Sequence, residues 1–174
     1  QKSYNGVAIA SKFPIEEPKK GFSSLIEIDD CNKDIDEQKR IISAVINGVK
    51  IINVYVPNGS EVFSEKYEYK LKWLDYFGSY MNYLDQENQP ICIAGDFNIA
   101  PMTSDVYNPE LWGRSIMTSA KEINALKDSI GNNFKDSFRL FDKSSGSWSW
   151  WDYRNRSFEK NEGSGGGSAE IINT

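Results

Sequence analysis

Residues 89–101 read QPICIAGDFNIAP, an apolar run that ends in a polar turn. The run at 91–94 is short and bounded by turn residues, which predicts a buried strand that stops at Gly95. Asp96 and Asn98 follow directly. Asp and Asn are common in the turn that ends a strand. A carboxylate and a carboxamide at a partly buried strand end also suit proton transfer and oxyanion binding. The stretch alone leaves both interpretations open.

Four strands are expected before this run, at 4–11, 21–28, 39–46 and 49–56. The first two are separated by a turn rich in proline and charge, FPIEEPKK. The last two flank Asn47 and Gly48, and an Asn-Gly pair between hydrophobic runs is the strongest short-range signal for a β-hairpin. The first third of the chain is therefore predicted to form strands joined in hairpins.

The hydrophobic period changes after the fourth of these strands. Ser64 followed by Glu65 is typical of a helix start, and apolar residues then recur at steps of three and four. This amphipathic helix is expected to cover the sheet and lead into the strand at 91–94. A second helix is predicted over 119–130, ending at Gly131. Strands in hairpins followed by long helices that return to further strands predict a layered α/β (α+β) domain.

The end of the chain differs in composition. EGSGGGSAEIINT contains Ser-Gly-Gly-Gly-Ser, which behaves as flexible coil. Beside aromatic-rich, ordered sequence, such a tract is typical of an engineered splice. We therefore predict a partial domain at 1–163, a Gly/Ser linker at 164–168 and a reinserted or permuted strand at 169–174.

Composition limits the class of protein. A chain of 174 residues with five Trp, nine Tyr and nine Phe can form one domain with a substantial core. It shows no apolar segment of membrane-spanning length and no leader peptide, and the placement of Cys31 and Cys92 suits a reducing compartment, so we expect a cytoplasmic protein without membrane contacts. The net charge of −5 argues against a general polyanion binder without excluding a local basic face. Because the sequence contains no histidine, acid–base chemistry falls to carboxylates, tyrosine or lysine.

Three further stretches carry side chains that suit chemistry, and each also has a plain structural interpretation. INVYVPNGS at 52–60 is a strand followed by a Pro-Asn-Gly turn. SWSWWDYRNRSF at 147–158 is either an aromatic cluster at a sheet edge or a surface that stacks on an unpaired base or sugar while arginines hold phosphates. DVYNPELWG at 105–113 is, on its own, a loop packed by its own Tyr and Trp.

In this order and spacing, the chain resembles the exodeoxyribonuclease III-like abasic-site endonucleases of the endonuclease/exonuclease/phosphatase fold. The resemblance covers nearly all of residues 1–163 and rests on DEQKRII, NVYVPNG, KYEYKLKWL, GDFNIAP, DVYNPELW and SWWDYR. It implies a two-layered β-sandwich flanked by helices, here incomplete, with the active site where strand ends meet. It also implies a DNA-repair phosphodiesterase that uses Mg²⁺ or Mn²⁺, cuts double-stranded DNA beside abasic sites and trims 3′ ends.

Three residues match the catalytic positions of that family. The resemblance implies that Asp96 activates or positions the water that attacks the phosphodiester. It implies that Asn98 hydrogen-bonds the phosphate and holds the aspartate, and that the phenol of Tyr55 contacts the phosphate. The chemistry is consistent, because burial moves a carboxylate toward general-base strength and an amide donates to an oxyanion without adding charge.

The resemblance also implies a set of DNA contacts. Asn58 matches a residue that touches the DNA at the lesion. Trp150 or Trp151, in preference to Trp148, matches the apolar wall for a flipped-out abasic sugar. Three arginines are weaker matches to family residues that contact the DNA backbone: Arg40, Arg114 and Arg154.

The sequence departs from the family pattern at both ends. The family's WNxNS-like strand and its QE segment, whose Asn and Glu contribute to the metal site, precede anything that matches Gln1. The family pattern continues with RID and SDH segments, which supply an Asp and a His. This chain leaves the pattern before them, at Gly163. Asp96 and Asn98 are then the metal-ligand candidates that remain in the 174 residues, so we expect weak metal binding.

The final residues, AEIINT, have two interpretations. They resemble the family's first strand, in which case they begin a circular permutation. They equally resemble the strand that leads toward SDH, in which case the linker replaces an internal segment. Both interpretations predict a strand at 169–173 that is tethered back into the sheet, and both allow a complementing fragment of the same protein as a partner.

Three functional hypotheses remain. The first is a Mg²⁺-dependent phosphodiesterase that acts on abasic DNA, impaired in this chain. The second is a non-catalytic remnant or engineered scaffold that keeps the fold and weak DNA affinity. The third is the same fold acting on a phosphoinositide or small phosphoester. SWWDYR and DVYNPELW argue against the third, because they match the DNA-repair branch.

Overall fold

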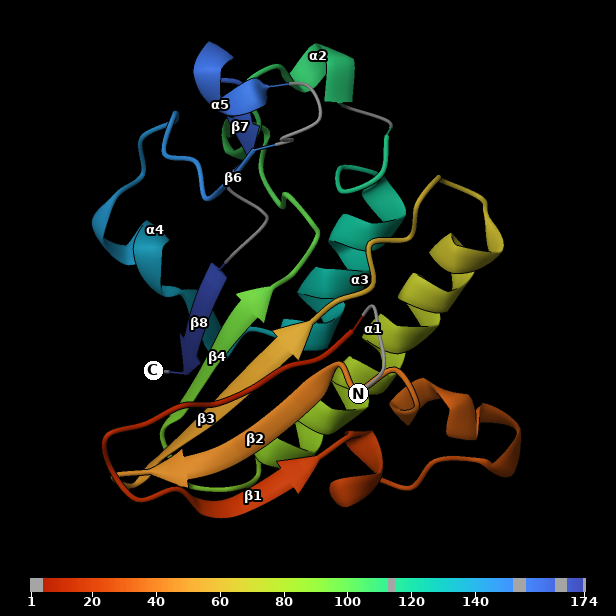
Figure 1. Cartoon of the computed structure of the whole chain (residues 1–174), viewed down its shortest axis with the longest axis vertical. Helices are drawn as coiled ribbons and strands as arrows, with labels where there is room; N and C mark the ends of the chain where they lie inside the picture. The colour runs from red at the N-terminus through yellow and green to blue at the C-terminus, as the bar shows by residue number, and fades with distance from the viewer. Residues whose placement is uncertain (1–4, 113–114, 152–155, 165–168, 174) are drawn as a thin grey trace.

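The computed structural model describes residues 5–112, 115–151, 156–164 and 169–173. Within these ranges six strands form one sheet in the order β1-β2-β3-β4-β8-β5 (Figure 1). The strands are β1 (Glu16–Lys20), β2 (Ile41–Ile46), β3 (Val49–Tyr55), β4 (Ile91–Asp96), β5 (Phe134–Asp136) and β8 (Ala169–Asn173). β3 and β4 run parallel, and the other neighbouring pairs are antiparallel. The parallel pair brings two carboxyl ends to one edge of the sheet.

The predicted hairpin is confirmed. β2 and β3 pair from Ile46 opposite Val49, so the connection consists of Asn47 and Gly48. These two residues have φ angles of 51° and 79°, the left-handed conformation that a tight type I′ turn requires. The sequence signal and the backbone geometry therefore agree at this turn.

Both predicted helices are also confirmed, and they lie side by side on one face of the sheet as α1 (Glu65–Leu84) and α3 (Ala120–Ile130) (Figure 1). The side chain of Ser64 accepts a hydrogen bond from the N–H of Tyr67, which satisfies one of the donors that a helix start leaves unpaired. α3 ends at Gly131, whose positive φ of 68° glycine adopts readily and other residues rarely do.

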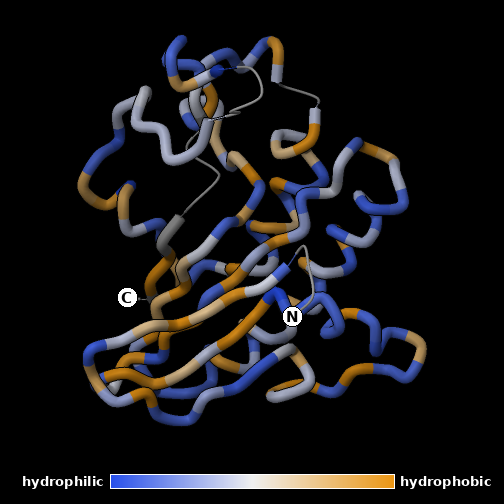
Figure 2. Tube along the Cα trace, viewed as in Figure 1, coloured by the Kyte–Doolittle hydropathy of each residue, from blue (hydrophilic) through white to orange (hydrophobic). Residues whose placement is uncertain are grey.

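The core fills the space between the sheet and these helices. Figure 2 shows apolar residues concentrated along the central strands. The buried core residues include Ile52, Val54, Ile91 and Ile93 from the sheet, Trp73, Leu74 and Phe77 from α1, and Leu126 from α3. Burying one such side chain is worth about 1.5–3 kcal/mol. The two helices are held to the sheet mainly by this apolar face.

The strand predicted at 21–28 is wrong. Phe22–Ser24 form a 3₁₀ turn, η1, instead. The carboxylate of Asp36 accepts hydrogen bonds from the N–H groups of Phe22 (2.7 Å) and Ser23 (2.9 Å), so a side chain satisfies donors that a strand would pair with its neighbour. The ring of Phe22 packs against Trp73, with ring centroids 5.1 Å apart. A single buried aromatic residue, rather than an alternating strand, anchors this segment.

The strand predicted at 4–11 is also wrong over its described part, which has no strand pairing. It stays near the sheet through a hydrogen bond from Asn53 Nδ2 to the carbonyl of Ala8 (2.8 Å). The edge strand β1 lies instead inside FPIEEPKK, which was predicted as a turn. Its pairing with β2 shifts register between Glu16 and Lys19. An irregular edge strand tolerates proline, because a missing N–H costs little there.

The mixed α/β class is confirmed. Beside the sheet, the described residues form a two-stranded ribbon of β6 (Trp150–Trp151) and β7 (Gly163–Ser164). The sequence predicted a two-layered β-sandwich. The described residues form one large sheet of it, together with the helices that cover that sheet. The remaining elements are α2 (Pro109–Trp112), α4 (Ser137–Phe141), α5 (Ser157–Lys160), and the 3₁₀ segments η2 (Asp30–Asp36) and η3 (Thr103–Asp105).

The last strand, β8, lies antiparallel between β4 and β5. Residues 165–168, most of the predicted linker, lie outside the described ranges, so the division of the chain at 163 and 168 stays a prediction. None of the described helices combines the length and the apolar character that a membrane-crossing segment needs.

Candidate active site

The carboxyl ends of β3 and β4 place two of the predicted catalytic residues next to each other. Tyr55 lies directly opposite Asp96 in the parallel register. The strands stay joined beyond this pair, because the N–H of Val56 donates to the carbonyl of Asp96 at 2.9 Å. Partners in a parallel pair carry their side chains on the same face of the sheet. The phenol and the carboxylate therefore belong to one site.

Gly95 makes this close pairing possible. Its φ is 141°, and a Cβ built on it would lie 2.0 Å from the carbonyl oxygen of Val54. No real side chain tolerates such a contact, and residues other than glycine rarely adopt that φ. The glycine before Asp96 is therefore required for β4 to reach β3 at the end that carries the carboxylate.

Asn98 joins the two loops that follow β3 and β4. Its backbone N–H donates to Asp96 Oδ1 at 3.0 Å. Its side-chain amide donates to the carbonyl of Val56 at 3.0 Å and accepts from Asn58 Nδ2 at 3.0 Å. Asn98 has a φ of 49°, a left-handed conformation that Asn adopts more readily than most residues. The structure thus brings Asn58, Asn98 and Asp96 together at one edge of the sheet, and their catalytic and DNA-binding roles stay a prediction.

The environment of Asp96 suits a proton acceptor. Burial raises the pKa of Asp96 above its ordinary value. The hydrogen bond from Asn98 and the positive charges of Lys70 and Arg40 oppose this rise. Desolvation makes a carboxylate a stronger base, while nearby donors keep it ionised. These features suit the general-base role predicted for Asp96, which stays a prediction.

Arg40 packs on Tyr55, whereas the resemblance implied a DNA-backbone contact. Its guanidinium carbon lies 4.6 Å from the centre of the Tyr55 ring. Its nitrogens donate to the carbonyl of Tyr55 (3.1 Å), to Gln38 Oε1 (2.8 Å) and to Asn5 Oδ1 (2.8 Å). Burial lowers the pKa of Arg40. In this structure the arginine orients the tyrosine, and a role toward DNA stays a prediction.

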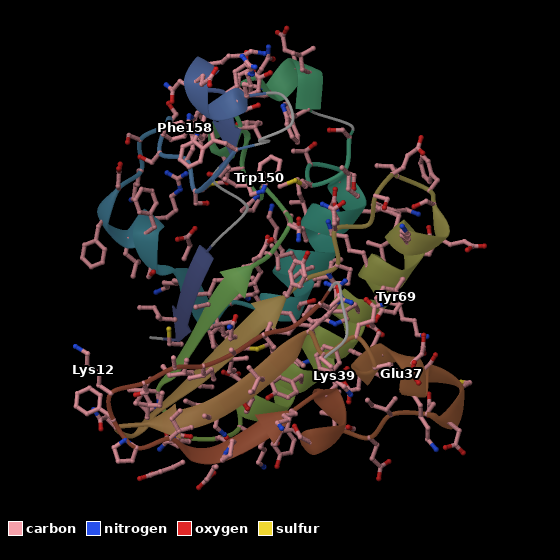
Figure 3. The ribbon with its side chains drawn as sticks, in the orientation of Figure 1. Lys12, Glu37, Lys39, Tyr69, Trp150 and Phe158 are labelled. Atoms are coloured by element: carbon pink, nitrogen blue, oxygen red, sulfur yellow. The ribbon has the colours of Figure 1, made fainter. Side chains whose placement is uncertain are left out.

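The predicted tryptophan wall lies beyond the ends of β3 and β4. Trp150 and Trp151 form β6 opposite β7, and the ring of Trp151 meets Phe158 edge-on at 5.2 Å. Figure 3 shows Trp150 and Phe158 in this group of elements, beyond the sheet edge. The N–H of Tyr107 donates to the carbonyl of Gly163 at 3.2 Å, which ties DVYNPELW to the same ribbon. Arg114 and Arg154 lie outside the described residues.

A cavity of about 850 Å³ adjoins this edge of the sheet. Its lining is largely apolar and includes Asp96, Phe97, Leu126, Phe134, Arg139 and Trp148. Trp148, which the sequence analysis ranked below its neighbours, lines the cavity, whereas Trp150 and Trp151 are not among its lining residues. The space beside the candidate base is therefore apolar and large enough for a small ligand.

Comparison with known proteins identifies the family. The model of the Endonuclease/Exonuclease/phosphatase family matches residues 1–164. The chain belongs to the Endonuclease/Exonuclease/phosphatase family. An exodeoxyribonuclease of Bacillus subtilis is 30% identical over 164 residues, which are 94% of this chain and 61% of that protein.

Solved structures of this family agree. A 3′ phosphatase from Neisseria, bound to a product DNA hairpin, superimposes with a TM-score of 0.84 at 27% identity. An AP endonuclease from Archaeoglobus fulgidus gives a TM-score of 0.78 at 27% identity. Each comparison covers 94% of this chain and 60% of the other. The chain thus spans about three-fifths of the length of these relatives.

Nucleases of this family generally depend on a metal ion. Among the described residues, no group of three or more His, Cys, Asp or Glu side chains is arranged to hold one. The site offers the carboxylate of Asp96, while the amide of Asn98 is already hydrogen-bonded to Val56 and Asn58. Mg²⁺ is usually held by one or two carboxylates together with waters and substrate phosphates, so one carboxylate and one engaged amide fit only a weak site in the absence of DNA.

Two ion pairs around the site, one behind it and one in the cavity lining, were not predicted from the sequence. Lys70 lies on the buried face of α1, between Tyr67 and Leu74, and it forms an ion pair with Glu122. Arg139 pairs with Asp105, which holds the start of η3 through the N–H of Met102. A lysine among apolar residues of an amphipathic helix is a signal that could have indicated the first contact.

Proposed function

We propose that this chain carries the hydrolytic residues of a DNA-repair phosphodiesterase that cuts beside abasic sites and trims 3′ ends. The observation that carries the proposal is the convergence of Tyr55, Asp96 and the Asn58–Asn98 pair at one sheet edge, beside an apolar cavity. The names of the relatives, an exodeoxyribonuclease, a 3′ phosphatase and an AP endonuclease, describe enzymes that hydrolyse phosphate esters. A base beside a phosphate-binding group is what such hydrolysis requires.

In the proposed step, Asp96 accepts a proton from a water molecule as the water oxygen bonds to phosphorus. The phosphorus–oxygen bond to the leaving group breaks, and that oxygen keeps the electron pair and takes a proton from solvent. The N–H of Asn98 holds the carboxylate in place. The phenol of Tyr55 donates to a non-bridging phosphate oxygen, which stabilises the developing charge.

In the same proposal DNA is held from two sides of the site. Asn58 is exposed on the loop after β3 and contacts the sugar-phosphate backbone at the lesion. Trp150 and Trp151 supply the aromatic wall with Trp148 inside the cavity, while Arg40, Arg114 and Arg154 contribute positive charge along the backbone. An abasic sugar suits an apolar wall, because it lacks the base that would need hydrogen bonds.

A second candidate is a scaffold of the same fold that binds DNA weakly and does not cut it. It is favoured by the lack, among the described residues, of any group of three or more His, Cys, Asp or Glu side chains that could hold a metal ion. A metal ion or a second cation would normally neutralise charge on the phosphate, and one lost donor of this kind costs about 10²–10³-fold in rate. The two candidates differ in whether Asp96 contributes to any measurable cleavage.

We predict that the purified 174-residue chain binds abasic duplex weakly and in a salt-sensitive way, and cuts it slowly. The measurement is single-turnover gel analysis of labelled abasic duplex with Mg²⁺, with and without peptides that carry the family segments outside the matched region. Slow cleavage that increases with the peptides and is lost in Asp96→Asn supports the phosphodiesterase. Cleavage that is absent under all these conditions favours the scaffold, whereas cleavage that is unchanged in Asp96→Asn contradicts the assignment of Asp96 as the base.

We also predict weak binding of Mg²⁺ in the absence of DNA. The described residues contain no group of three or more His, Cys, Asp or Glu side chains that could hold a metal ion, and Mg²⁺ sites usually combine one or two carboxylates with substrate phosphates, which are missing without DNA. Isothermal titration calorimetry of the chain with MgCl₂ should give no saturable binding heat at micromolar Mg²⁺. The Asp96→Asn variant should give the same heats as the parent chain. Tight one-to-one binding would show that a further ligand completes the site.

A further inference from the structure

Behind the candidate site lies a fully buried ion pair that the proposed reaction does not use. Lys70 of α1 and Glu122 of α3 have side chains with 0% exposure, and their charged atoms lie 2.5 Å apart. Burial lowers the pKa of Lys70, and the adjacent Glu122 carboxylate opposes that change. A buried pair of this kind often adds no stability over apolar residues of the same size. Its presence therefore calls for an explanation other than stability.

The ammonium of Lys70 makes contacts that reach the site. Besides Glu122, it donates to the backbone carbonyl of Asn98 at 2.8 Å and to that of Asn58 at 3.3 Å. An ammonium group has three N–H donors, so these three acceptors account for all of them. Two of the three belong to the residues that form the Asn58–Asn98 hydrogen bond. One buried cation therefore holds both loops from behind.

The loop after β3 depends on the same side chain in a second way. Gly59, with a φ of 88°, packs so closely that a Cβ there would lie 3.1 Å from Lys70 Cδ. Asn98 also has a left-handed backbone. Such conformations cost energy and persist where the surroundings determine them. The aliphatic part of Lys70 supports one loop and its ammonium supports both.

Glu122 is itself fixed, so Lys70 has a rigid partner. Its Oε1 accepts the N–H of Ser119 at 2.9 Å in a helix-capping arrangement. The hydroxyl of Ser119 lies 2.6 Å from the hydroxyl of Tyr67, on the same helix as Lys70. The chain of contacts therefore runs from the start of α3 through the ion pair to the two loops of the site.

We propose that Lys70, held by Glu122, is a positioning residue that sets the distance and orientation of Asn58 and Asn98, and through Asn98 the orientation of Asp96. The expected effect of Lys70 on DNA cleavage rests on the proposed function, whereas its effect on the position of the two loops does not. Misplacing reacting groups by about 1 Å can reduce a rate by about 10²-fold. Loss of Lys70 should thus impair the site beyond any loss of stability.

The experiment compares three variants of the full chain, namely Lys70→Met, Lys70→Met with Glu122→Gln, and the control Lys50→Met with Glu87→Gln. Lys50 is another largely buried lysine paired with a glutamate, but it lies at the opposite end of β3 from Tyr55. Glu122→Gln keeps the oxygen that caps α3 and removes the charge that Lys70→Met leaves unpaired. Three properties are measured: the Tm, the side-chain amide NMR signals of Asn58 and Asn98, and the affinity and cleavage rate on abasic duplex.

Lys70→Met should lower the Tm sharply, because it leaves a buried carboxylate without its partner. The double variant at 70 and 122 should regain most of that Tm. Its Asn58 and Asn98 amide signals should still shift or broaden, and cleavage should fall about 10- to 100-fold. The control pair should leave the amide signals and cleavage as in the parent.

Parent-like amide signals and cleavage in the stable double variant would overturn the proposal and reduce the pair to a structural contact. If the parent chain does not act on DNA, the proposed function fails. The amide signals of the double variant would then still decide whether Lys70 positions the two loops.

Discussion

Asp96→Asn is expected to lower the single-turnover rate of phosphodiester cleavage by about 10²–10⁴-fold, the usual contribution of a general base. Asn is nearly the same size and keeps the oxygen that accepts the N–H of Asn98. The backbone contacts of Asp96 across to Val56 are unaffected by the change. The substitution therefore removes the proton acceptor and leaves the geometry of the site in place.

The same substitution should not destabilise the protein at neutral pH, and a small rise in Tm is expected. Burial raises the pKa of Asp96 from its ordinary value of 3.8, so the folded state holds this proton more firmly than the unfolded state does. Stability therefore falls as the pH rises from the unfolded pKa through the higher folded one. Above that pH window the Asp96 carboxylate of the wild-type protein is a desolvated charge. The amide of the Asn variant is uncharged and avoids this cost.

Two measurements test this prediction together. Single-turnover cleavage of abasic duplex gives the rate, and thermal melting between pH 3 and pH 8, roughly the range over which a raised carboxyl titrates, gives the stability. The difference in Tm between variant and wild type should grow in favour of Asn as the pH rises. A variant that keeps more than about a tenth of the rate is incompatible with Asp96 as the general base. A large loss of Tm at pH 7 would instead show that the carboxylate is mainly structural.

Gly95→Ala should destabilise the fold by more than about 3 kcal/mol, at the upper end of single substitutions. The added Cβ would lie 2.0 Å from the carbonyl oxygen of Val54, which is backbone in the neighbouring strand and cannot rotate away. To accommodate it, β3 and β4 must separate where they carry Tyr55 and Asp96. The change should therefore harm stability and the site at once.

Gly131→Ala is the matched control for this substitution. Gly131 also has a positive φ, 68°, but a Cβ there would meet nothing within 4 Å. It should cost less than Gly95→Ala, about 1–3 kcal/mol, because its φ of 68° and ψ of −164° are strained for any other residue but no clash is added. Urea unfolding followed by tryptophan fluorescence gives both values. Equal costs at the two positions would show that β3 and β4 do not approach as closely as the structure indicates.

Local sequence is enough to predict the parts of this protein that depend on neighbours a few residues away. The Asn47-Gly48 turn, the helix start at Ser64 and the end of α3 at Gly131 follow from local backbone preferences and hydrogen bonds. The motif GDFN was placed at a strand end for the same reason. Its chemical interpretation came from the resemblance of several motifs in order, since an acid and an amide after a strand are common in ordinary turns.

The features that join distant segments could not be predicted in this way and became visible in the folded protein. β1 formed within a predicted turn because β2 offered an edge, and 21–28 was not a strand because Asp36 and Trp73 hold Phe22. Arg40 turned toward Tyr55, and Lys70 reached Glu122, 52 residues away, and the carbonyl of Asn98. Such contacts depend on which buried polar groups meet in space and must satisfy one another, and neither periodicity nor local propensity encodes that.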